Sequence, residues 1–160
     1  MEPTDVLAAL SQAIQAEEEA RAFYENASRS TDDPGGAEMF AELARFEAHH
    51  RDRLVALRDS LDAGGGWVAY DGRPLPQTPS AEASGRKAVG AHAGVLEALR
   101  VAVAAEERAE AQYRALAREA PDEKGRAMFE ALAAEEAMHR KLLDDQYYAL
   151  ANRGVWLWGD

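Results

Sequence analysis

The chain has 160 residues, and its balance of 47% hydrophobic and 29% charged residues is that of a soluble globular protein with a single domain, residues 1–160. The formal net charge of −11 disfavours a nucleic-acid partner, and the absence of cysteine excludes disulfides, thiolate nucleophiles, iron–sulfur clusters and zinc ribbons. No stretch is long and apolar enough to cross a membrane, and the first residues lack the pattern of a secretory signal. We therefore expect a cytoplasmic protein with no membrane partner.

The first half of the chain predicts a helical hairpin, residues 4–62. Over residues 4–30, apolar side chains recur at spacings of three and four, which is typical of one face of a helix. A turn follows, in which Asp33 is suited to cap a second helix and Pro34 to occupy its first position. The same apolar spacing then predicts a helix over about 36–62.

A long connection, residues 63–91, separates this hairpin from a second one. It contains a run of three glycines and three of the six prolines, and we expect at most a short helix within it, at 80–89. Helices over about 92–119 and 122–151 then form the second hairpin. Short loops within hairpins and one long crossover between them predict an all-α, antiparallel four-helix bundle.

The second hairpin repeats the first. Shifting the chain by 89 residues aligns 6–68 with 95–157 without a gap, and 26 of the 63 aligned pairs are identical. Some matches are accidental in an alanine-rich chain, but matched tyrosine, tryptophan and histidine residues are rarer by chance. The identical pairs include Glu17/Glu106, Tyr24/Tyr113, Glu47/Glu136, His50/His139 and Trp67/Trp156. We interpret the chain as a duplicated helical hairpin.

Six ionisable side chains interrupt the apolar faces of the predicted helices. They are Glu17, Glu47, His50, Glu106, Glu136 and His139. A carboxylate inside a bundle is costly or takes up a proton, and four at one level would repel one another. Two divalent cations would balance the four carboxylates, and the two imidazoles would bind them neutral. The pattern therefore predicts a site for two metal ions.

The spacing within two of the helices supports this prediction. Glu47 and His50, like Glu136 and His139, form a Glu-x-x-His motif, whose two side chains project from one face of a helix. A mixture of carboxylate and imidazole suits iron or manganese and tolerates zinc. Two other interpretations are charges that face solvent and a buried ion-pair network without metal. The second is disfavoured because no lysine or arginine shares these helix faces at that level.

Two segments resemble a known family. Residues 13–24, AIQAEEEARAFY, are similar to the first helix of rubrerythrins, which has a metal-binding glutamate followed by a Phe-Tyr pair. Residues 40–50, FAELARFEAHH, are similar to the second helix. The resemblance covers nearly the whole chain and implies a ferritin-like fold with a di-iron centre.

The resemblance also implies a role for each ligand and an activity. Glu47 and Glu136 would bridge the two ions as the central catalytic carboxylates. Each ion would be held by one further pair, Glu17 with His50 or Glu106 with His139. Members of the family react reduced di-iron with hydrogen peroxide or dioxygen, which reoxidises the metal pair.

The chain departs from rubrerythrins in two respects. It has no cysteine-rich rubredoxin segment, so turnover would require an external electron donor. The family also places an additional glutamate three residues after the ligand of the third helix, where this chain has Ala109. Glu110 lies about 100° around the helix and cannot replace it. The ligand set is therefore closer to the symmetric arrangement of bacterioferritins.

Five further side chains lie near the predicted ligands or the hairpin ends. Tyr24 and Tyr113 each follow a predicted ligand by seven residues, nearly on the same helix face. They could hydrogen-bond to a ligand carboxylate, act as redox-active catalytic phenols, or serve as core aromatic rings. Trp67 and Trp156 follow the hairpins and are expected to pack at the bundle ends. His49 points away from its neighbouring ligand and is expected to face solvent or an interface.

The predicted centre favours an oxidoreductase that reduces hydrogen peroxide or dioxygen while it oxidises Fe(II). Such a protein would act as a di-iron peroxidase in oxidative stress. Open coordination positions are needed, and six ligands on two ions leave some. The alternatives are a ferroxidase or iron-handling protein and a bundle without catalysis, and a manganese catalase-like centre also stays open. Because hairpins joined by a long crossover can be exchanged between subunits, we expect a homodimer.

Overall fold

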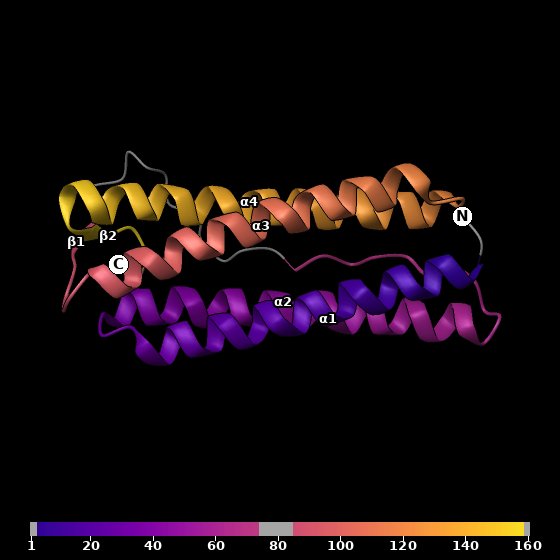
Figure 1. The fold of residues 1–160 in the computed structure, drawn as a ribbon, viewed down its shortest axis with the longest axis horizontal. Helices are drawn as coiled ribbons and strands as arrows, with labels where there is room; N and C mark the ends of the chain where they lie inside the picture. Colours follow the sequence, from indigo (N-terminus) through magenta and orange to yellow (C-terminus); the bar gives the residue numbers. More distant parts are fainter. Residues whose placement is uncertain (1–2, 74–84, 159–160) are drawn as a thin grey trace.

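A computed structural model describes residues 3–73 and 85–158 of the chain. Four long helices form two antiparallel hairpins, α1 with α2 and α3 with α4 (Figure 1). Their bounds are α1 Pro3–Ser30, α2 Pro34–Asp62, α3 Ala93–Glu119 and α4 Glu123–Arg153. The predicted all-α four-helix bundle is confirmed, and each helix begins and ends close to its expected bounds. No helix in the described ranges is long and apolar enough to cross a membrane.

The two hairpins meet through side chains. Within each hairpin the helices pack along their length, whereas the backbones of α1 and α3 approach each other at few points. The apolar side chains form two core clusters, one that includes Leu54 and Phe129 and one that includes Phe40 and Leu143. Each cluster contains one of the two tyrosines whose hydroxyls reach the predicted ligands. The polar residues therefore lie between two apolar regions that hold the hairpins together.

Reciprocal tryptophan–glycine contacts fasten the hairpins at both ends of the bundle. Trp67, which follows α2, lies against Gly125 of α4, and Trp156, which follows α4, lies against Gly36 of α2. A Cβ atom would lie 2.4 Å from the Trp67 ring at Gly125 and 2.5 Å from the Trp156 ring at Gly36. Glycine at these two helix positions is therefore what makes room for the indoles. The expected packing role of both tryptophans is confirmed.

Asp33 joins the turn between α1 and α2 to the end of the crossover. Its carboxylate accepts hydrogen bonds from two backbone N–H groups in the first turn of α2, as the capping prediction required, and Pro34 is the first helical residue. It also accepts from the Arg86 guanidinium and the Val89 N–H, each at 2.9 Å. Burial alone would raise the pKa of Asp33, but these donors outweigh it and lower the pKa to about 2.

A short strand takes the place of the helix expected within the crossover. β1 (Arg86–Lys87) pairs antiparallel with β2 (Val155–Trp156) at the end of the bundle. Gly85 and Gly90 have φ angles of +67° and +88°, a left-handed backbone that does not continue a right-handed helix. The expectation of a helix at 80–89 was therefore wrong for its described part, and its first five residues lie outside the described ranges.

The segment that follows α2 runs lengthwise between the hairpins, along α2 and α4 (Figure 1). His49 of α2 has its Nε2 atom 2.8 Å from the backbone oxygen of Asp71, and the Tyr70 hydroxyl donates to Glu135 of α4. His49 is half-buried as a result, and its contact with the segment after α2 lies at the surface, so the prediction that it faces solvent or an interface is neither confirmed nor contradicted. The contact with Asp71 itself could not be predicted, because helical periodicity does not give the path of a long connection.

Candidate metal centre

The six predicted ligands converge at one place in the bundle interior. They are Glu17 on α1, Glu47 and His50 on α2, Glu106 on α3, and Glu136 and His139 on α4. None is more than 3% exposed, which excludes the interpretation that these charges face solvent. The Glu-x-x-His motifs of α2 and α4 face each other, with the two imidazole rings nearly parallel and their centroids 5.9 Å apart.

The ligand atoms form two groups of four that have two carboxylates in common. One group is Glu17, Glu47, His50 and Glu136, and the other is Glu47, Glu106, Glu136 and His139. Within each group, one donor atom per residue lies within 4.8 Å of the others. Two cations held by these groups would share Glu47 and Glu136.

Each histidine presents its Nδ1 atom to the cluster. His50 Nδ1 lies 2.8 Å from a Glu136 oxygen and 3.4 Å from Glu17. His139 Nδ1 lies 3.3 Å from a Glu47 oxygen and 3.7 Å from Glu106. Within residues 3–73 and 85–158, the glutamates of the cluster form ion pairs with these two histidines and with no lysine or arginine. An ion-pair network built on lysine or arginine is therefore excluded for the described part of the chain.

In the metal-free protein, bound protons balance the negative charge of the four carboxylates. Burial and then the charge of Glu47 raise the pKa of Glu17 to about 8. Burial and then the charges of Glu106 and Glu17 raise the pKa of Glu136 to about 8 as well. Burial opposes protonation of the two imidazoles, but the surrounding carboxylates outweigh it and raise both histidine pKa values. Cations would displace these protons.

Several buried polar atoms of the cluster lack a hydrogen-bond partner among the described residues. They are Glu47 Oε1, Glu136 Oε2 and both ring nitrogens of His139, whereas His50 Nδ1 and Glu136 Oε1 have only each other, at 2.8 Å. Buried polar groups in native proteins are almost always satisfied, and each unsatisfied one costs about 1–3 kcal/mol. Carboxylate oxygen and imidazole nitrogen are ligands for iron, manganese and zinc. The residues present therefore fit a pair of such cations, and the cluster is a candidate metal-binding site.

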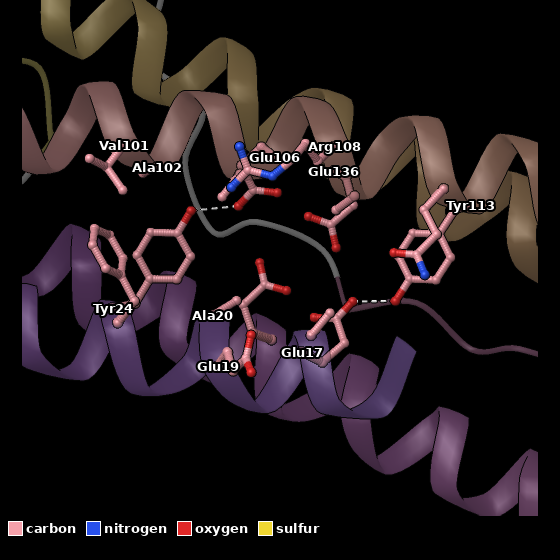
Figure 2. A pocket seen from close by; sticks show the side chains of 16 residues that line it. Glu17, Glu19, Ala20, Tyr24, Val101, Ala102, Glu106, Arg108, Tyr113 and Glu136 are labelled. Carbon is pink, nitrogen blue, oxygen red and sulfur yellow. Dashed lines mark hydrogen bonds between the residues drawn. The ribbon is translucent and has the colours of Figure 1, made fainter. Parts of the chain in front are cut away.

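Two tyrosines hold the outer carboxylates in place across the hairpins (Figure 2). The Tyr24 hydroxyl on α1 donates a 2.5 Å hydrogen bond to Glu106 on α3, and the Tyr113 hydroxyl on α3 donates to Glu17 on α1. Burial and then the charge of the accepting carboxylate raise both tyrosine pKa values well above 10, so both phenols stay protonated as donors. Of the three roles considered for these residues, the geometry favours hydrogen bonding to a ligand.

A pocket between α1 and α3 leads to the cluster (Figure 2). Its volume is about 420 Å³, and small side chains form much of its wall, among them Ala20 and Ala109. Glu47 and Glu136, the shared carboxylates, form part of the lining. The pocket therefore extends from the cluster toward the side of the bundle where α1 and α3 approach each other at few points.

Sequence reasoning placed Glu110 correctly outside the cluster but missed Glu135. Glu110 pairs with Arg114 and Arg140 on the outer face, so no carboxylate takes the place of Ala109. Glu135, the residue before a predicted ligand, lies 2.8 Å from His50 Nε2. The available signal was its mismatch in the repeat, where the equivalent residue is phenylalanine.

Comparisons with known proteins identify the fold and the family of this chain. No curated protein matches the chain. A hypothetical protein from Pyrococcus furiosus has a similar fold, with a TM-score of 0.74 and 23% sequence identity over 94% of this chain and 93% of its own. The Rubrerythrin family model matches residues 8–80 and 97–153, which include all six cluster residues. The chain therefore belongs to the rubrerythrin family, within the ferritin-like di-iron superfamily.

Proposed function

We propose that this protein is an oxidoreductase that reduces hydrogen peroxide or dioxygen at a di-iron centre. The observation that carries the proposal is the pair of four-residue donor groups that share Glu47 and Glu136. Four buried carboxylates balance two divalent ions, and the mixture of oxygen and nitrogen donors suits iron, with manganese or zinc as alternatives. Two ferrous ions would supply the two electrons that, together with two protons, convert one hydrogen peroxide molecule into two water molecules.

The protein would contribute ligand placement and substrate access. The hydrogen bonds from Tyr24 and Tyr113 orient the outer carboxylates, and both tyrosines retain their protons because of their raised pKa values. The pocket between α1 and α3 would admit the substrate to the shared carboxylates. On the opposite side, the segment after α2 covers the cluster, so we expect the substrate to enter between α1 and α3.

The electrons would come from a separate donor. The chain contains no cysteine, which excludes an iron–sulfur or rubredoxin-type relay within it. We expect a reductase or a small reducing molecule to restore the ferrous state after each turnover, and a homodimer remains the expected assembly.

A second candidate is a ferroxidase or iron-handling role. It is favoured by the position of Glu110, which pairs with Arg114 and Arg140 and leaves a symmetric set of six ligands. In that role, iron would itself be the substrate, and its oxidation would be the purpose of the reaction.

Peroxide consumption tests the proposal. Ferrous-loaded protein, supplied with ascorbate, should consume hydrogen peroxide faster than the same iron without protein. Glu47→Ala should lose at least about 100-fold of this rate, since it removes a ligand common to both ions. Glu107→Gln, at an exposed position of α3, is the matched control and should keep the wild-type rate.

Three outcomes separate the candidates. Catalytic peroxide consumption that depends on Glu47 supports the proposal. Retention of many irons per subunit in a large particle, with little peroxide turnover, supports iron handling. Peroxide consumption that survives Glu47→Ala would refute a reaction at this centre.

A further inference from the structure

The duplication makes the cluster an internal comparison of two half-sites. The first half-site contains Glu17 and His50, the second Glu106 and His139, and both share Glu47 and Glu136. The tyrosines that hold the outer carboxylates are also matched by the repeat. If two positions that are equivalent in the repeat carry different residues next to the cluster, the two half-sites can therefore differ in metal affinity.

Positions 46 and 135 are such a pair. They are equivalent in the repeat, since they lie 89 residues apart, and each precedes the glutamate of a Glu-x-x-His motif. The first is Phe46 and the second is Glu135, and each side chain packs against the histidine of the other hairpin. The two histidines therefore have different neighbours behind them.

His50 has a carboxylate behind its ring. Its Nδ1 atom faces the cluster, and its Nε2 atom lies 2.8 Å from Glu135 Oε2. The Tyr70 hydroxyl donates a second hydrogen bond to the same carboxylate oxygen, so Glu135 is held from two sides. The backbone of Gly72 is also close, because a Cβ atom there would lie 2.6 Å from Glu135 Oε1. The crossover, through Tyr70 and Gly72, thus holds the Glu135 carboxylate in place beside His50.

His139 has an aromatic ring in the equivalent place. Its ring meets Phe46 edge to face, with the centroids 4.8 Å apart and an angle of 80° between the planes. Its Nε2 atom has no hydrogen-bond partner within the described ranges. The guanidinium carbon of Arg73, which pairs with Glu42, lies 5.1 Å from the centre of the Phe46 ring.

This difference has a direct consequence for cation binding. A carboxylate that accepts the Nε2–H of a ligating imidazole fixes the tautomer with a free Nδ1 lone pair and makes that lone pair more basic. Loss of such a partner costs about 10–100-fold in metal affinity. His50 has this support from Glu135, whereas His139 does not.

We propose that Glu135 is a positioning residue that makes the His50 half-site the tighter of the two, so that metal ions load in order. The first ion binds at Glu17, Glu47, His50 and Glu136, and the second completes the pair at Glu106 and His139. The first ion is retained, and the second exchanges with the solution. This inference rests on the proposed metal centre and extends it, and it does not depend on peroxide turnover.

The test is a titration of the metal-free full chain with Zn²⁺, in competition with a chromophoric chelator. The wild type should show two binding events whose dissociation constants differ at least about tenfold. Glu135→Gln should weaken the tighter event about 10–100-fold and leave the other nearly unchanged. Glu130→Gln, an exposed position on the same helix, is the matched control and should change neither event.

A second measurement assigns the events to the half-sites. One equivalent of Co²⁺ added to protein with ¹⁵N-labelled histidine should broaden the His50 imidazole signals before those of His139, with assignments taken from His50→Asn and His139→Asn. In Glu135→Gln this preference should disappear. If Glu135→Gln does not fold, Tyr70→Phe replaces it, and the expected result is a smaller weakening of the same tight event.

Equal affinities in the wild type, first occupancy at His139, or equal weakening of both events in the variant would each overturn the inference. Absence of any Zn²⁺ binding would refute the metal centre and, with it, the proposed function. Unequal binding in a protein that consumes no peroxide would refute the proposed function alone and support ordered loading.

Discussion

Replacing Glu136 by glutamine should make the metal-free protein more stable and remove most of its stabilisation by metal. This carboxyl group is 1% exposed, and its near polar neighbours include His50 Nδ1, 2.8 Å from one oxygen, and His139 Nδ1, 3.5 Å from the other. Burial and the charges of Glu106 and Glu17 raise its pKa from 4.5 to about 8. At pH 7 the folded chain must therefore keep a proton that the unfolded chain releases.

The size of the effect follows from this pKa. Between pH 4.5 and pH 7, each pH unit costs about 1.4 kcal/mol, or about 3 kcal/mol in all. Glu136→Gln removes this cost and keeps the side-chain size, so about 3 kcal/mol is the upper limit of the gain. For a chain of this length, that corresponds to a rise in Tm of roughly 5–10 °C.

With metal bound, the wild type should be more stable than Glu136→Gln, the reverse of the order expected without metal. Each ion at about 100 times its dissociation constant stabilises the folded state by about 2.7 kcal/mol, so two ions add about 5 kcal/mol to the wild type. Glu136→Gln lacks a ligand common to both half-sites and should lose most of this gain.

Thermal denaturation followed by circular dichroism at pH 7, with and without Mn²⁺, measures both effects. Glu107→Gln is the control, and it should change either Tm by little, because an exposed substitution is worth about 0.5 kcal/mol or less. A metal-free Glu136→Gln protein less stable than the wild type, or one with a full metal response, would refute the reasoning.

Three further predictions concern the metal-free protein. Its free energy of unfolding should fall as the pH rises from about 4.5 to 8. The reason is that Glu17 and Glu136 have a pKa near 8 in the folded chain and near 4.5 in the unfolded chain, so their contribution to stability is present below pH 4.5 and is lost as the pH approaches 8. Urea denaturation at pH 5 and pH 8 measures this difference, and equal stability at the two pH values would contradict the prediction. Asp33→Ala should cost about 2–4 kcal/mol in the free energy of unfolding, since it removes a helix cap and the carboxylate that accepts from the Arg86 guanidinium. Asp33→Asn should recover about 1 kcal/mol of the cap, as chemical denaturation can show. Gly125→Ala should lower the Tm by roughly 3–10 °C through displacement of Trp67, whereas Gly94→Ala, with open space around it, should not; equal effects at the two glycines would argue against the packing explanation.

The helices and the six cluster residues could be predicted because both depend on local periodicity. Three residues along a helix bring a side chain back to nearly the same face, so Glu47 and His50 had to share a direction once α2 was assigned. The duplication then placed Glu136 and His139 at the same level of the second hairpin. The buried positions of these four residues follow from the apolar side chains that flank them along each helix.

The partners of these residues could not be predicted in the same way. Glu135 and His50 are 85 positions apart, and Tyr70 and Glu135 are 65 apart, so no helical spacing relates them. The position of Tyr70 depends on where the crossover runs, and the strand at Arg86 depends on the C-terminal segment beside it. Tyr24 illustrates the difference between the two kinds of prediction. The helix face on which it lies was predictable, whereas the acceptor of its hydrogen bond, Glu106 of the other hairpin, was not.

The sequence by itself determined which side chains face the interior, because helical periodicity and an exact repeat fix direction and level along each helix. Only the tertiary structure decided which of those side chains meet, since contacts between hairpins depend on how the helices approach and on the path of the connection between them. Phe46 and Glu135 occupy equivalent positions in the repeat, and the fold placed one behind His139 and the other behind His50. The symmetry of the duplicated sequence is therefore broken where the two hairpins come together.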